Sequence, residues 1–178
     1  MDSNTEQATQ QAQEQNDGMH PDTHIGHVHL KVSDLERSVK FYIEVIGFKL
    51  MQRWGNSAAF LSSGNYHHHL GLNTWESRGG PPSPRGAAGL YHFAILYPNR
   101  VELARALKRI VDHGWEIDGA SDHGVSEAIY LHDPDLNGIE IYRDRPVSEW
   151  PRDPNGEIAM MSDPLDLVGL LGELEREK

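Results

Sequence analysis

Apolar and polar residues mostly alternate along residues 24–32, a pattern that predicts a half-buried β-strand. Apolar side chains would cover one face of this strand, and His27 would lie on the opposite, polar face. A second strand with a histidine near its front, His92, is predicted at residues 91–96. The two strands indicate that one structural pattern is used twice along the chain.

Behind the first strand, apolar residues recur at helical spacing over residues 35–46 and predict a helix. Ser33 or Asp34 can cap this helix, and Glu36 is placed to complete a capping box with Ser33. Gly47 follows the last helical residue, a position where glycine commonly ends a helix. Three shorter strands are then predicted, at residues 48–53, 58–61 and 67–73.

The second strand is followed by the same order of elements. Asn99 is placed to cap a helix that Gly114 closes. The buried face of this helix is predicted to carry Leu103, Leu107 and Ile110. Three strands are again predicted, near residues 115–118, 128–132 and 138–143. Sequence identity between the two halves is slight, so the repeat is one of pattern, and it predicts an α+β fold of two tandem βαβββ modules.

The composition of the segments predicts the domain organisation. Residues 1–22 are rich in Gln, Asn and acidic residues and are expected to form a disordered tail. Residues 23–147 are expected to form one domain, with module 1 at about 24–75 and module 2 at about 90–146. A segment rich in Gly, Pro and Ser, residues 76–89, would link the modules. Residues 148–178 form an extension with an amphipathic helix that is expected to dock on the domain or on a partner.

Charge and cysteine content narrow the classes of function. Sixteen basic and 27 acidic residues give a net charge of -11, which argues against binding to nucleic acid or to an anionic membrane. The chain has no cysteine, so a metal site must use nitrogen and oxygen ligands. A reducing compartment suits this composition, and no apolar run approaches the ~20 residues of a membrane helix. We therefore expect a cytoplasmic protein.

Three residues are candidates for a metal site between the two modules. His27 and His92 lie near the front of equivalent strands, and Glu140 lies in the last strand of module 2. Glu140 stands between Ile139 and Ile141, whose side chains are expected to face the core. An ionised carboxylate in such a strand needs a metal or a cation beside it. Two imidazoles and one carboxylate leave open positions on a divalent metal.

A strand, a helix and three strands, used twice, resemble the vicinal oxygen chelate superfamily of glyoxalases, bleomycin resistance proteins and extradiol dioxygenases. The match covers residues 24–146. The motifs that carry it are Asp34-Leu35-Glu36-x-Ser38 with Phe41-Tyr42 and Gly47-Phe48, and Asp133-Pro134-Asp135-x-Asn137-Gly138-x-Glu140. The resemblance implies a curved mixed sheet around a metal cavity, with His27, His92 and Glu140 as the metal ligands.

The segment before Glu140 resembles the extradiol dioxygenase branch of this superfamily. His123, five residues, Ile129-Tyr130 and Asp133-Pro134 follow the pattern of that branch. The sequence departs from the pattern at Ser121 and Leu136, where the branch has other residues. The resemblance implies catalytic roles for His123 and Tyr130. Longer stretches resemble the N-terminal half of bacterial catechol 2,3-dioxygenases of the CatE type.

The histidine run at residues 67–69 leaves an alternative open. Strand alternation would turn His67 and His69 toward the cavity and His68 toward the apolar residues. The glyoxalase I branch has a metal ligand that aligns with His69. The dioxygenase branch has an acid/base histidine that aligns with His68, which implies that His68 is catalytic. His69 is therefore kept as an additional ligand or cavity residue.

The expected function is ring cleavage of a small catecholic substrate by O2, with Fe(II), or Mn(II) in its place, as the metal. One alternative is a glyoxalase I-like lyase or isomerase, or a thiol transferase, with Ni(II), Zn(II) or Mn(II). Another is a bleomycin-resistance-like binding protein, which has no need of the two histidines and the glutamate. A homodimer or a higher homo-oligomer is expected.

Overall fold

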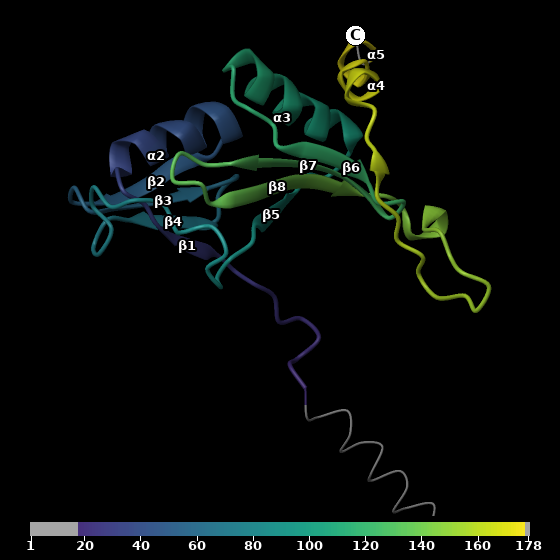
Figure 1. The fold of residues 1–178 in the computed structure, drawn as a ribbon, viewed down its shortest axis with the longest axis horizontal. Helices are drawn as coiled ribbons and strands as arrows, with labels where there is room; N and C mark the ends of the chain where they lie inside the picture. Colours follow the sequence, from purple (N-terminus) through teal and green to yellow (C-terminus); the bar gives the residue numbers. More distant parts are fainter. Residues whose placement is uncertain (1–17, 177–178) are drawn as a thin grey trace, which may run out of the picture.

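The computed structural model describes residues 18–176. Most of the expected disordered tail, residues 1–22, therefore lies outside the described residues. The strands form two mixed sheets, one for each module, and the helices lie on the same side of both sheets (Figure 1). The α+β fold and the repeated module are confirmed. The strands of the two modules do not join into one continuous sheet within the described residues.

Module 1 contains a four-stranded sheet covered by one helical segment. Its strand order is β1-β4-β3-β2, and β1 and β4 run parallel. Its elements are β1 (Val28–Lys31), α2 (Leu35–Phe41), a π-helix (Tyr42–Ile46), β2 (Lys49–Trp54), β3 (Ala58–Ser62) and β4 (Leu70–Asn73). Gly47 ends the helical segment with φ 98°, as the sequence predicts.

Module 2 repeats the arrangement with a strand added by the C-terminal extension. Its sheet has the order β5-β8-β7-β6-β9, and β5 and β8 run parallel. Its elements are β5 (Phe93–Leu96), α3 (Arg100–Asp112), β6 (Gly119–Asp122), β7 (Ser126–His132) and β8 (Gly138–Asp144). Asn99 caps α3 by accepting a hydrogen bond from the amide of Glu102, and the predicted leucines and isoleucine of α3 are buried.

Two local predictions are wrong. Asp34, one of the two predicted caps, does cap α2, but the capping box of Ser33 with Glu36 is wrong, because Glu36 forms an ion pair with Arg53 instead. Residues 115–118 do not form a strand. The indole of Trp115 packs on Phe41 with ring centroids 4.5 Å apart, and its Nε1 donates to the carbonyl of His132. The strand of this region starts only at Gly119.

The turn between β7 and β8 holds the two modules together on the helix side. Asp135, which is almost buried, accepts hydrogen bonds from the amide and hydroxyl of Ser33 and from Arg37, at 3.1, 2.5 and 2.5 Å. Beside it, the hydroxyl of fully buried Tyr42 donates to Asp133 at 2.9 Å. Two carboxylates of module 2 thus receive donors from the helical segment of module 1, and this fixes the relative placement of the modules.

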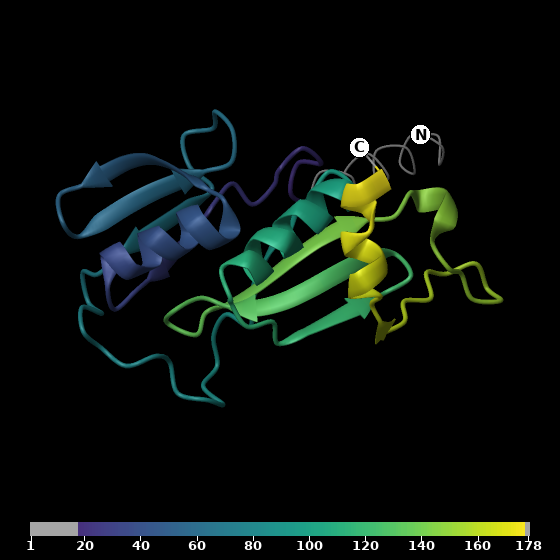
Figure 2. The same ribbon diagram turned by 90° about the horizontal axis from the view of Figure 1, so that it is seen from above.

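The C-terminal extension packs on module 2. It contains a 3-10 turn (Val147–Glu149), β9 (Asp163–Pro164), α4 (Leu167–Leu171) and α5 (Glu173–Arg176). Figure 2 shows α4 beside α3 above the module 2 sheet, and Leu170 is fully buried there. In the structure the extension packs on the domain, and two short helices stand where a single helix was expected. Among residues 18–176 no helix has the length and apolar character needed to cross a membrane.

Leu136 explains one departure from the sequence pattern and gives a testable prediction. It is the only described residue other than glycine with positive φ, 64°, and it is 59% exposed, so it gains little packing in return for the strain. We expect Leu136→Gly to raise the free energy of unfolding by about 0.5–1 kcal/mol. Urea unfolding measures the change. Leu136→Ala, which keeps the strain, is the control and should not stabilise the protein to the same extent.

Candidate active site

Glu140 and His92 come together on the module 2 sheet, on the face away from α3. Ile139 and Ile141 are buried on the helix side, so the alternation of β8 turns Glu140 to the other face. On that face the carboxylate of Glu140 has His92 as a partner, whose Nε2 lies 2.9 Å from Oε2. The side chains of His92 and Glu140 are 31% and 14% exposed. One nitrogen and one oxygen that can each bind a metal thus lie close together at a half-buried position.

The approach of His92 to β8 depends on Gly138. A Cβ at this position would lie 2.2 Å from the carbonyl oxygen of Tyr91 and 3.1 Å from Cβ of His92. Any larger residue would push the start of β5 away from β8. The glycine in the sequence motif before Glu140 is therefore needed for the pairing of His92 with Glu140.

Tyr130 lies directly across from Glu140 in the β7–β8 pair. Its hydroxyl is 3.4 Å from Oε1 of Glu140 and 2.8 Å from Nε2 of His123. Burial, followed by the negative charge of Glu140, raises the pKa of Tyr130 to about 12. The phenol therefore keeps its proton at neutral pH and can donate it in a hydrogen bond.

His123 completes a line of hydrogen-bonding groups across the sheet. Its Nε2 faces Tyr130, and its Nδ1 lies 2.8 Å from the backbone carbonyl oxygen of Met161 in the C-terminal extension. Four residues follow one another across the sheet: His92 just before β5, Glu140 on β8, Tyr130 on β7 and His123 just after β6. Four of the residues selected from the sequence are therefore neighbours.

His27 lies apart from this line. It immediately precedes β1 on the module 1 sheet, and its ring packs against His68 with centroids 4.6 Å apart. No group of three metal-binding side chains is present among residues 18–176. The structure thus assembles His92 with Glu140 but keeps His27 on the other module.

The histidine run precedes β4, which begins at Leu70, so strand alternation does not govern it. His68 faces His27 and Phe60, and its pKa is lowered by burial and then by repulsion from His27. His69 turns to β3 instead, where its Nδ1 accepts a hydrogen bond from the amide of Ser63 and lies 2.9 Å from the hydroxyl of Ser62. His68 is thus on the side of His27, and only Nε2 of His69 is left for another partner.

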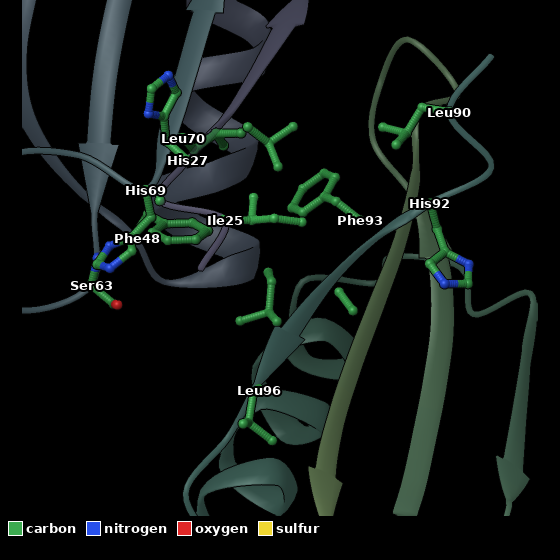
Figure 3. Close-up of a pocket in the computed structure, with 14 residues that line it drawn as sticks. Ile25, His27, Phe48, Ser63, His69, Leu70, Leu90, His92, Phe93 and Leu96 are labelled. Carbon is green, nitrogen blue, oxygen red and sulfur yellow. The ribbon is translucent and has the colours of Figure 1, made fainter. Parts of the chain in front are cut away.

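A cavity of about 600 Å³ lies between the two modules and is lined mainly by apolar side chains (Figure 3). His27 and His92 stand on its opposite walls, and in Figure 3 their rings point away from each other. Apolar side chains such as Phe93 and Phe48 line the cavity between these two histidines. The hydrogen-bonding groups Glu140, Tyr130 and His123 therefore lie on the module 2 sheet beyond His92 and do not line this cavity.

Met161 is the one member of the site that the sequence did not suggest. It contributes a backbone carbonyl, which any residue would supply, and it lies 38 positions after His123. No pattern of side chains marks such a contact. Only the course of the C-terminal extension over β6 places it there.

Comparison with known proteins places these residues in a family context. The profile of the Glyoxalase/Bleomycin resistance protein/Dioxygenase superfamily matches residues 24–141. Catechol-2,3-dioxygenase of Bacillus subtilis is 45% identical over 90% of this chain and 55% of its own length. Biphenyl-2,3-diol 1,2-dioxygenase 3 of Rhodococcus globerulus is 28% identical over 67% of the chain and 63% of its own length. The chain thus spans less than two thirds of the length of these curated relatives.

Solved structures agree with the fold. A glyoxalase/dioxygenase from Nostoc punctiforme superposes with a TM-score of 0.58 at 21% identity, covering 74% of this chain and 99% of that one. At this identity the likeness concerns the fold alone.

Proposed function

This chain belongs to the Glyoxalase/Bleomycin resistance protein/Dioxygenase superfamily, and from that premise we propose that it is a metal-dependent extradiol dioxygenase. The proposed reaction opens the ring of a small catecholic substrate with O2. The observation that supports it most is the hydrogen-bonded line from Glu140 through Tyr130 to His123, beside His92. The relatives that are dioxygenases of diols support the same choice.

The side chains of His27, His92 and Glu140 have the ligand atoms that a divalent metal binds, and two of them, His92 and Glu140, already lie close together. His92 and Glu140 already converge to 2.9 Å, and imidazole and carboxylate are suitable ligands for Fe(II) or Mn(II). We propose His27 as the third ligand. It lines the same cavity as His92, and its ring would have to turn toward module 2 to join the pair. When bound, the metal would hold the catechol as a chelate and make O2 available beside it.

The groups around Glu140 are suited to accept a proton from the substrate. A catechol must lose at least one phenol proton to bind as a chelate. A substrate hydroxyl that donates to the oxygen of Tyr130 can pass its proton through Tyr130 to Nε2 of His123, because these two atoms are 2.8 Å apart. Tyr130 gains the proton of the substrate as it gives up its own, so it returns to its neutral form. His68, on the side of His27, is proposed as a second acid/base group.

The direct test is an assay of ring cleavage. The protein is loaded with Fe(II) without oxygen, catechol is added, and air is admitted. We expect a yellow ring-cleavage product and no product without metal. A protein that gives no such product with several catechols, but turns over the methylglyoxal–glutathione adduct with Ni(II), would be a glyoxalase-like enzyme. Binding of bleomycin without any turnover would make it a binding protein. The expected self-association stays a prediction.

A further inference from the structure

We propose that the C-terminal extension is a positioning element for catalysis. The backbone carbonyl of Met161 fixes the imidazole of His123 as the tautomer that carries its proton on Nδ1. The consequence for catalysis rests on the proposed function, whereas the tautomer itself can be measured in the protein without substrate or metal. The carbonyl of Met161 contacts His123, and His123 in turn contacts Tyr130, so Met161 acts on Tyr130 only through His123.

The contact extends the pairing of two strands. β9 pairs antiparallel with β6, so that Asp122 stands opposite Asp163. Two residues before Asp163 and one residue out of this register, the amide of Met161 donates to the carbonyl of His123 at 3.2 Å. The amide of His123 does not bond to Met161 in return, because it donates to Ser126 in the turn to β7 at 2.8 Å. The imidazole Nδ1–H supplies the missing donor to the Met161 carbonyl.

The partners of the two ring nitrogens decide the tautomer. A backbone carbonyl can only accept a hydrogen bond, so Nδ1 of His123 must carry a proton to bond to Met161 at 2.8 Å. In the neutral ring Nε2 is then without a proton. It accepts the hydroxyl proton of Tyr130 at 2.8 Å, because the other acceptor of that hydroxyl, Oε1 of Glu140, is farther away at 3.4 Å. The opposite tautomer would turn an N–H toward Tyr130 and a lone pair toward the carbonyl, which would lose the bond to Met161.

The extension is held close to His123 by contacts on both sides of Met161. Before it, the indole Nε1 of Trp150 donates to the carbonyl of Arg145 at 2.8 Å. After it, Leu170 is fully buried against the core. Gly124, with φ 74°, leaves room for the extension, because a Cβ there would lie 2.8 Å from Pro151 and 3.3 Å from Met161. The carbonyl of Met161 is thus part of a segment fixed at both ends.

This arrangement prepares His123 to accept a proton. The bare Nε2 faces Tyr130 before any substrate arrives, so a proton can move from a substrate hydroxyl through Tyr130 without a change of ring orientation. The imidazolium that results keeps its Nδ1–H on Met161 and is stabilised by the same carbonyl. The C-terminal extension therefore contributes to the direction of proton movement.

The test is NMR spectroscopy of the full-length protein labelled with 15N on histidine, at a pH where His123 is neutral. Two-bond correlations between the C–H protons of the ring and its nitrogens distinguish a protonated from an unprotonated ring nitrogen. The variant His123→Gln identifies which signals belong to His123. We expect a protonated Nδ1 and a bare Nε2 on His123. A ring with its proton on Nε2 would overturn the proposal.

A backbone change tests the role of the carbonyl itself. Replacing the amide of Ser162 by an ester, through incorporation of the matching hydroxy acid, makes the Met161 carbonyl a weaker acceptor and leaves every side chain in place. We expect a larger share of the Nε2–H tautomer and a fall of kcat for ring cleavage by about tenfold. The same ester at Met160, which alters the carbonyl of Ala159, and the variant Ser162→Ala should leave the tautomer unchanged.

The outcomes separate the two proposals. An ester at Ser162 that leaves the tautomer of His123 as in the wild type would show that Met161 does not control it. A wild-type protein that cleaves no catechol yet holds the proton on Nδ1 would refute the dioxygenase function, while the assignment of Met161 as the partner of His123 would stand.

Discussion

Replacing Glu140 by glutamine is expected to lower kcat/KM for ring cleavage by at least about 100-fold, because the amide removes the carboxylate proposed as a metal ligand. The loss should also appear without any turnover. Wild-type protein titrated with Mn(II) should bind one ion, and Glu140→Gln should bind it far more weakly in the same calorimetric experiment. The variant also loses the partner of His92, whose Nε2 lies 2.9 Å from the carboxylate.

The control for this variant is Glu36→Gln, which changes an exposed glutamate paired with Arg53 on the surface. It should keep the activity and the metal affinity of the wild type. A Glu140→Gln protein that binds Mn(II) as tightly as the wild type would exclude Glu140 as a ligand. Unchanged metal affinity together with lost activity would instead point to a role in catalysis through Tyr130, which lies across the sheet from it.

Glu127→Gln is expected to lower the free energy of unfolding by about 3 kcal/mol, the largest effect on stability that we predict. Glu127 is 3% exposed and accepts hydrogen bonds from Nε or Nη2 of three arginines, Arg100, Arg143 and Arg145, at 2.9–3.2 Å. Removing its charge leaves these guanidinium groups close together in a half-buried region. The loss should stay near 3 kcal/mol because Arg100 and Arg145 keep bonds to Glu173 and Asp122.

Urea unfolding of Glu127→Gln and Glu36→Gln under the same conditions measures the difference between a buried and a surface ion pair. The surface variant should lose less than about 1 kcal/mol, because Glu36 is exposed to water and salt. A loss below about 1 kcal/mol for Glu127→Gln would show that the arginines find other partners and that this cluster does not stabilise module 2.

Part of the site could be predicted because it is local. The turn at Asp133–Asn137 folds β7 back on β8, and the hydrogen bond from the amide of Asp133 to the carbonyl of Asn137 closes it. Once this turn is formed, strand pairing puts Tyr130 opposite Glu140. The contact between Tyr130 and Glu140 therefore follows from their spacing around this turn. The same holds for Asn99 as a cap and for the buried face of α3.

Other contacts could not be predicted, because they join segments that are far apart in the chain. The ion pair of Glu36 with Arg53 replaced the expected capping box, since a bidentate guanidinium competes well with a local hydrogen bond. The side of His68 was undecided from the sequence because alternation applies only inside a strand, and β4 begins two residues later. The arginines around Glu127 come from α3 and from the end of β8.

The sequence by itself determined the two βαβββ modules and the helix cap at Asn99, and it narrowed the other cap to Ser33 or Asp34. These depend on periodicity, capping and turns, which act over a few residues. Only the tertiary structure decided that His92 meets Glu140 while His27 remains on module 1, and that Met161 binds His123. Such contacts depend on how whole sheets and the C-terminal extension pack, and packing sums many weak interactions that no short motif encodes.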